Sequence, residues 1–177
     1  MKLLIVLGII IVLITILTLI IINSKNRFLF LNIKIKEANS NIGLFLQKKK
    51  ITLGNIIKII IDEKSDEDKF KDYESLVKNE NDTFKLHSIL NKYYSILAKL
   101  LLDNEDLSKN QDIINHLINL KSNEEDLIGS IKFYNDTVVD YNGLIKTFPH
   151  KMYAKIKSLD TKDFYNNEKE ELFDILK

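Results

Sequence analysis

Glu124 is the first residue whose type and position could support chemistry. It occupies an apolar stripe, four residues after Leu120 and three before Leu127. A carboxylate on the buried face of a helix is costly unless it is paired or hydrated. It could act as one half of a general acid–base pair, but no second carboxylate falls on the same stripe. We therefore interpret Glu124 as a buried polar residue that fixes helix register.

A Tyr-Asn dipeptide occurs twice, seven residues apart, in a segment that closes on Phe-Pro. The marked residues are Tyr134, Asn135, Tyr141, Asn142, Phe148 and Pro149. Seven residues are almost two helical turns, so the tyrosines share one helix face, as do the asparagines. In a structural interpretation the rings lie in the core, and the amides bond to a neighbouring helix. In a functional one, the same side chains form a groove for a peptide or partner helix. We favour the structural interpretation, because a helix inside a bundle needs contacts that fix its register.

Other candidate sites are weak, so we predict no catalytic residue, no cofactor and no metal. His87, His116 and His150 share no ligand spacing, and the acidic residues 62–68 lack the glycine and the spaced carboxylates of a calcium loop. The sequence contains no glycine-rich phosphate loop, no nucleophile elbow and no cysteine. These features predict that the protein is not an enzyme.

The charge pattern also argues against nucleic acid as a partner. The net charge is +1 and 29% of residues are charged, so the surface is mixed. A nucleic-acid-binding domain usually carries a basic stripe interleaved with aromatic residues. The compact basic run, residues 48–50, is interpreted as a solvated turn at the end of a helix.

The elements that position these residues are predicted to be long amphipathic helices. Apolar residues recur at alternating steps of three and four, and no strand-like alternation is sustained. The three series are Phe28, Leu31, Ile35, Ala38, Ile42, Phe45; Leu86, Leu90, Tyr93, Leu97, Leu100; and Ile113, Leu117, Leu120, Leu127, Ile131, Tyr134, Val138, Tyr141, Ile145, Phe148. The fold class is all-α.

Helix boundaries follow from the polar and proline signals. The first helix is expected to end within 47–50 and a second to begin near Thr52, with a polar turn at 79–82 and a third helix over about 83–102. A capping box at 108–111 begins the longest helix, which Pro149 stops at Phe148. Residues 172–176 hold a short amphipathic stretch. Four main helices with short loops predict an antiparallel up-and-down bundle.

The N-terminal segment is predicted to anchor the protein in a membrane. Residues 3–22 carry no charge, and at helical rise they span about 30 Å, the thickness of a bilayer's hydrocarbon core. A cleaved signal peptide is the alternative, but its apolar region would be shorter and no small-residue cleavage site follows. We assign residues 1–23 to the anchor and residues 24–177 to the bundle. The excess of Lys and Arg after the anchor favours a cytoplasmic bundle, and the lack of cysteine fits a reducing compartment.

The segment YNDTVVDYNGLIKTFP resembles the LemA family of bacterial membrane-anchored helical proteins. The similarity continues upstream through Glu124 and into the first helix around residues 37–42, and so covers most of the chain. The family usually carries tryptophan at the position of Asn39, proline at that of Gly54 and arginine at that of Ile131. The resemblance implies one transmembrane helix followed by a four-helix bundle, and a role in membrane organisation.

Two functions of different classes follow. The first is a non-enzymatic membrane-tethered scaffold or interaction module, with a membrane protein or a second copy as partner. The second is a ligand-sensing or adaptor bundle that serves another membrane protein, such as a protease. Only Met1 and Lys2 precede the apolar segment, so a ligand-sensing receptor that signals across the membrane is disfavoured.

Overall fold

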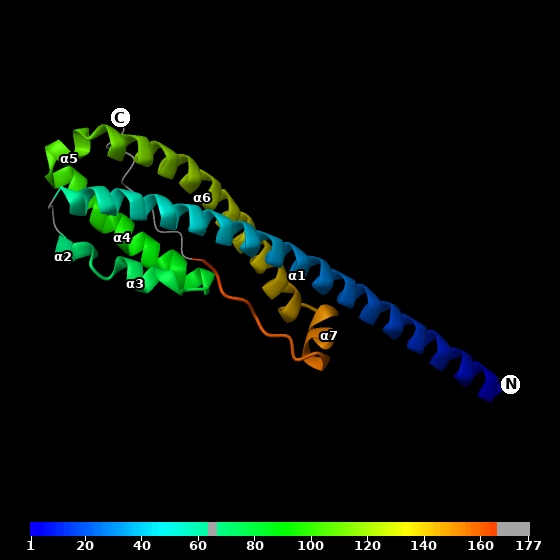
Figure 1. Ribbon diagram of the computed structural model, residues 1–177. Coiled ribbons are helices and arrows are strands. Elements are labelled where there is room, and N and C mark those ends of the chain that lie inside the picture. The colour runs from blue at the N-terminus through cyan, green and yellow to red at the C-terminus, as the bar shows by residue number, and fades with distance from the viewer. Residues whose placement is uncertain (64–66, 166–177) are drawn as a thin grey trace. The chain divides into compact units, whose positions relative to one another are not determined.

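The computed structural model describes residues 1–63 and 67–165, and every regular element within them is a helix (Figure 1). The all-α prediction is confirmed for this part of the chain. The helices are α1 (Lys2–Asp62), α2 (Glu67–Phe70), α3 (Tyr73–Lys78), α4 (Thr83–Asp103), α5 (Glu105–Lys109), α6 (Gln111–Lys146) and α7 (His150–Ile156).

The chain divides into two compact units, and both α1 and α6 contribute to each. The first unit combines Met1–Glu37 with Phe133–Phe164, and the second combines Ala38–Lys132 with the chain from Tyr165. The first unit therefore holds the apolar N-terminal segment, the end of α6 and α7. The second holds the rest of α1, α2 to α5, and the beginning of α6.

The expected break within 47–52 is wrong, because α1 runs as one helix to Asp62. Gly54 lies inside this helix, where a single glycine costs about 1 kcal/mol relative to alanine. Leu53, Ile56 and Ile60 on the same helix are fully buried, and each such side chain stabilises the fold by about 1.5–3 kcal/mol. The free energy gained by burying these side chains therefore outweighs the cost of Gly54, and the helix continues.

The other boundaries agree in part with the prediction. The polar break before Thr83 is confirmed, and Asp82 caps α4 by accepting from the backbone N–H groups of Phe84 and Lys85. The predicted capping box at 108–111 is wrong. Asn110 caps α6, accepting from Asp112 N and Ile113 N at 2.9 and 3.2 Å.

The predicted stripes form the cores of the two units. In the second unit α1, α4 and α6 bury Ile42, Leu46, Leu53, Leu86, Leu90, Tyr93, Leu97, Ile113, Leu117, Leu120 and Leu127. In the first unit α1, α6 and α7 bury Phe28, Leu31, Ile35, Tyr134, Val138, Tyr141 and Ala154. Phe45 and Ile145 are only half-buried, and Leu46 takes the core position predicted for Phe45.

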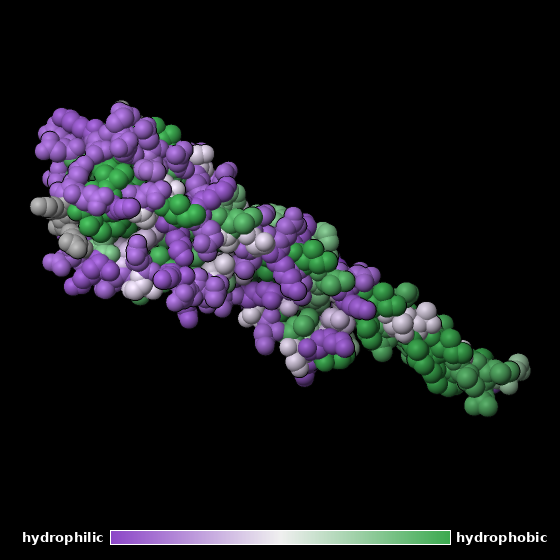
Figure 2. Space-filling view, viewed as in Figure 1, coloured by the Kyte–Doolittle hydropathy of each residue, from purple (hydrophilic) through white to green (hydrophobic). Residues whose placement is uncertain are grey.

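The apolar N-terminal part of α1 lies exposed in the first unit. This segment is long and apolar enough to cross a membrane, by length and composition, and its most apolar window buries nothing against the rest of the protein. Figure 2 shows it as a largely hydrophobic surface at the N-terminal end. An apolar surface of this extent fits a membrane anchor.

The four-helix count and the up-and-down order stay predictions. The described residues hold three helices of more than twenty residues, α1, α4 and α6, together with four short ones. The amphipathic stretch at 172–176 and residues 64–66 of the acidic run lie outside the described residues. The proposed domain boundary at residue 23 is likewise untested.

The continuity of α1 can be tested with proline at Gln47, an exposed position. Proline inside a helix costs about 3 kcal/mol relative to alanine. We expect Q47P to lower the free energy of unfolding by about that amount relative to the matched variant Q47A, measured by chemical denaturation of the full chain in detergent. Equal denaturation midpoints would show that a helix ends at this position.

Candidate functional site

A buried ion pair joins α1 to α6 within the second unit. Lys49 Nζ lies 2.9 Å from Glu124 Oε2, and the two side chains are 0% and 3% exposed. Lys49 follows Leu46 by three residues and precedes Leu53 by four, so it occupies the apolar stripe of α1. Glu124 occupies the corresponding position on α6. Helical periodicity thus directs both charges into the core, where each partner offsets the other's lost hydration.

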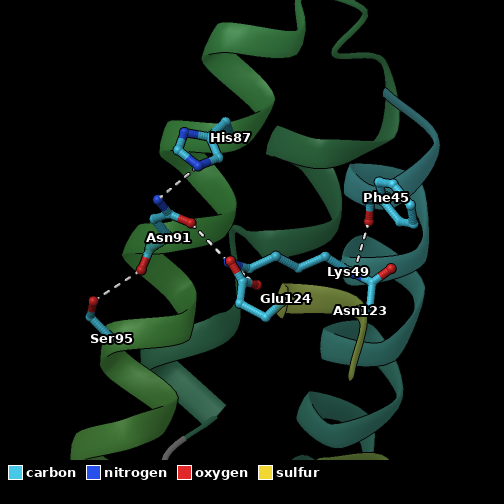
Figure 3. A network of polar contacts seen from close by, with 7 residues as sticks. All are labelled: Phe45, Lys49, His87, Asn91, Ser95, Asn123 and Glu124. Atoms are coloured by element: carbon cyan, nitrogen blue, oxygen red, sulfur yellow. Dashed lines mark hydrogen bonds and ion pairs between the residues drawn. The ribbon is translucent and has the colours of Figure 1, made fainter. Parts of the chain in front are cut away.

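α4 completes the surroundings of the Lys49 ammonium. Lys49 Nζ donates to Asn91 Oδ1 at 2.9 Å and lies 4.7 Å from the centre of the Tyr94 ring. A cation over an aromatic face gains electrostatic stabilisation, and more so when both are desolvated. Figure 3 shows the lysine side chain reaching across between α1 and α4 towards Asn91 and Glu124. Three helices therefore contribute groups to one buried charge.

Further hydrogen bonds extend this polar network. Asn91 Nδ2 lies 3.3 Å from His87 Nε2, one helical turn earlier on α4. Asn123, next to Glu124, donates from Nδ2 to the backbone oxygen of Phe45 at 3.0 Å (Figure 3). The second contact ties α6 to α1 one turn from the ion pair. We call Lys49, His87, Asn91, Asn123 and Glu124 the core network.

His87 is held neutral by its position in the core network. Burial lowers its pKa from 6.5 to about 4, and the positive charge of Lys49 acts in the same direction. The edge of the His87 ring also meets Tyr165, with centroids 5.7 Å apart. A neutral imidazole can accept from the Asn91 amide, whereas a protonated one would place a second cation near Lys49.

The geometry suits a structural role better than catalysis. Lys49 and Glu124 are buried and bonded to each other, so neither presents a free group to solvent. Among the described residues, no group of three or more His, Cys, Asp and Glu side chains could hold a metal ion. An ion pair buried between helices is best suited to specifying which residues face each other.

The tyrosines of the repeat lie in the core of the first unit. Tyr134 and Tyr141 are both buried, and burial raises the pKa of both hydroxyls. The Tyr141 ring packs edge-on against Phe28 of α1, with centroids 5.4 Å apart. A hydrogen bond with the Asn32 side chain opposes the shift at Tyr141. Both rings therefore occupy the positions that the structural interpretation predicts.

The asparagines of the repeat behave differently from one another. Asn142 makes a two-way bond with the backbone of Lys162: its amide donates to Lys162 O and its oxygen accepts from Lys162 N, each at 2.9 Å. The expected bond to a neighbouring helix is wrong for Asn142, because Lys162 lies in the non-helical segment after α7. Asn135 is half-buried.

Phe148 and Pro149 lie between α6 and α7 in the first unit. α6 ends at Lys146, two residues before the predicted stop, and α7 begins at His150. Phe148 is 77% exposed, so its assignment to the buried stripe is wrong. Phe148 lies after the end of α6, where the 3.6-residue period that places side chains on the buried face no longer applies. Pro149 is half-buried.

Lys49 is the site residue that sequence reasoning missed. The basic run at 48–50 is predicted to be a solvated turn, but Lys49 is fully buried inside α1. The apolar stripe could have indicated this burial, because its continuation from Ile42 through Leu46 to Leu53 includes Lys49. A lysine buried on that stripe needs an acidic partner. Glu124 is the carboxylate that lies on the apolar stripe of α6.

These features define a class of protein. Its regular elements, in the part of the chain that the structure describes, are all helices; an apolar N-terminal segment is exposed, and a charge pair is buried between two long helices. A comparison with protein families matches residues 38–174 to the LemA family, and this chain belongs to that family. The match covers most of α1 beyond the apolar segment, and all of α2 to α7. Curated proteins and solved structures gave no significant match.

The ion pair can be tested by removing one partner and then both. Replacing one partner leaves a buried, uncompensated charge and costs about 3–5 kcal/mol, whereas an apolar pair of similar volume is often tolerated. We expect K49M to lower the free energy of unfolding by about that amount, and K49M/E124L to recover most of the loss. Exposed Lys48 provides the matched control, and K48M should change stability by less than about 0.5 kcal/mol. A strictly additive double variant would contradict the pairing.

The pKa of His87 predicts acid sensitivity. Below pH 6.5 the unfolded chain takes up a proton at this residue, while the folded protein does so only near pH 4. Acid therefore favours unfolding, and the free energy of unfolding should fall between pH 6.5 and about 4, at up to about 1.4 kcal/mol per pH unit. H87Q should reduce that slope in denaturation curves, while H116Q, outside the core network, should retain it. An unchanged slope in H87Q would refute the assignment.

Proposed function

We propose that this LemA-family protein is a single-pass membrane protein whose helical bundle is a non-enzymatic scaffold for membrane-associated partners. Family membership supports the general class, and the exposed apolar segment of α1 supports the anchor. The core network supports a structural use of its charged groups, because each buried charge has a partner inside the protein. The outer surface is therefore where partners are expected to bind.

The observation that carries the scaffold proposal is an exposed apolar row on α1 in the second unit. Leu44 and Ile51 are 62% and 64% exposed and lie seven residues apart, on one face of the helix. Two large aliphatic side chains in the same row form the pattern of a helix seam that packs against another helix. We call this pair the α1 row. A membrane protein or a second copy of this chain would cover it.

The α1 row can be tested by site-specific photo-crosslinking in native membranes. A photoreactive residue at Leu44 or Ile51 should give a discrete crosslinked protein, and the double variant L44S/I51S should lose the interaction. Lys85 of α4, an exposed polar position, serves as the control and should give no discrete product. The same diffuse pattern at all three positions would contradict the proposal.

The proposed side of the membrane rests on the basic residues after the anchor. Lys25, Arg27, Lys34 and Lys36 lie within fifteen residues of the apolar segment, against Lys2 before it. Basic residues near a span favour the cytoplasmic side, so we propose a cytoplasmic bundle in an antiparallel up-and-down arrangement. Protease added to intact cells should leave the bundle uncut, and lysis should expose it. Cleavage in intact cells would reverse the orientation.

A further inference from the structure

α7, in the first unit, has two opposite faces of different character. His150 and Ala154 are buried against the unit. On the other side of the helix, Met152 and Ile156 are exposed, Ile156 to 67%. Phe148, which precedes the helix, is also exposed. A short helix that turns an apolar row away from the protein needs an apolar or interfacial neighbour.

Two contacts set the position of α7 along α1. His150 Nδ1 lies 2.9 Å from Ser24 Oγ, and the Tyr153 ring stacks on Phe28 with centroids 5.8 Å apart. Ser24 is fully buried, so this position is a packed part of the unit. Figure 1 shows α7 beside α1 within this unit, next to the helix turns that follow the apolar segment.

These contacts place the beginning of α7 at the depth of lipid head groups. The apolar segment ends at Ile22, and Ser24 and Phe28 lie about 3 and 9 Å further along the helix. The head-group layer on each side of the hydrocarbon core is about 5–7 Å thick. When α1 spans a bilayer, His150 is level with this layer and Tyr153 lies about 2–4 Å beyond its outer edge.

The exposed charges of α7 and of the residue that follows it have a single sign. The chain between Asp140 and Asp160 contains no acidic residue but carries Lys146, Lys151, Lys155 and Lys157. Lys151, Lys155 and Lys157 are all exposed. On α1, Lys25 and Arg27 occupy the same level, and the first acidic residue after the apolar segment is Glu37. An apolar row flanked by lysines is typical of a helix that lies in an anionic membrane interface.

We propose that α7 is a second membrane contact, whose Phe148, Met152 and Ile156 side chains enter the bilayer interface while its lysines bind anionic head groups. This inference rests on the proposed membrane anchor and adds a lipid preference to it. α7 would then hold the first unit against the membrane surface, so that α1 is not the single attachment.

The test uses the full chain, which contains no cysteine, reconstituted into vesicles. A fluorophore attached at M152C should be quenched by lipids that carry a nitroxide on the head group, and more strongly when phosphatidylglycerol is added to phosphatidylcholine. L13C reports the anchor and should be quenched by a nitroxide deep in the acyl chain. I33C, also an exposed apolar position, lies about 16 Å beyond Ile22 and should escape lipid quenching.

The outcomes separate this inference from the anchor. Quenching at L13C without quenching at M152C overturns the α7 contact and leaves the anchor standing. No quenching at L13C overturns the anchor itself. Protection of M152C from aqueous iodide without lipid quenching shows that a protein covers α7, and also overturns the inference.

Charge variants test the lipid preference. Each basic residue near an anionic surface contributes about fivefold to membrane binding, so K151Q/K155Q/K157Q should abolish the effect of phosphatidylglycerol at M152C. The matched triple K85Q/K92Q/K99Q removes the same charge from exposed positions of α4 and should retain the effect. Equal responses of the two triples would refute recognition of anionic lipid by α7.

Discussion

Two opposite charges removed from water impose the strongest constraint on the second unit. The Lys49 ammonium and the Glu124 carboxylate are buried at the same level of the core, and each is tolerated because the other lies 2.9 Å away. Any slip of α6 along α1 would leave both charges buried without compensation, a cost of several kcal/mol. Asn91 brings α4 under the same constraint, because its side-chain oxygen accepts from the same ammonium. Apolar stripes alone would permit several alignments, and the ion pair favours one.

A buried ion pair and exposed apolar side chains occur in the same protein, although most of its buried side chains are apolar. In the second unit the α1 row is exposed although the core behind it is complete. In the first unit the buried tyrosines and Phe28 form an aromatic core, and the apolar row of α7 faces outward. Fixed helix alignment and exposed apolar side chains are what the proposed scaffold would need. The buried charges of the core network are bonded to groups within the protein.

Patterns that repeat along one helix could be predicted from the sequence. The apolar segment, the stripes of α4 and α6, the turn before Thr83 and the buried tyrosines follow from period and composition. Contacts between distant segments could not be predicted in this way. The bond of Asn142 to Lys162 depends on where an irregular segment returns, which helical periodicity does not encode. Lys49 was misassigned because three adjacent lysines suggest a solvated surface, whereas position on the stripe decides burial.

The most direct measurement is the exchange rate of the Lys49 ammonium protons with water, observed by NMR with nitrogen-labelled lysine side chains. Lysine protons on the surface exchange rapidly, whereas a buried ammonium held by Glu124 and Asn91 should exchange far more slowly. One slowly exchanging signal that disappears in K49M and exchanges faster in E124Q is the predicted result. Exchange at Lys49 as rapid as at Lys48 would show that the charge is not buried, and would contradict the account.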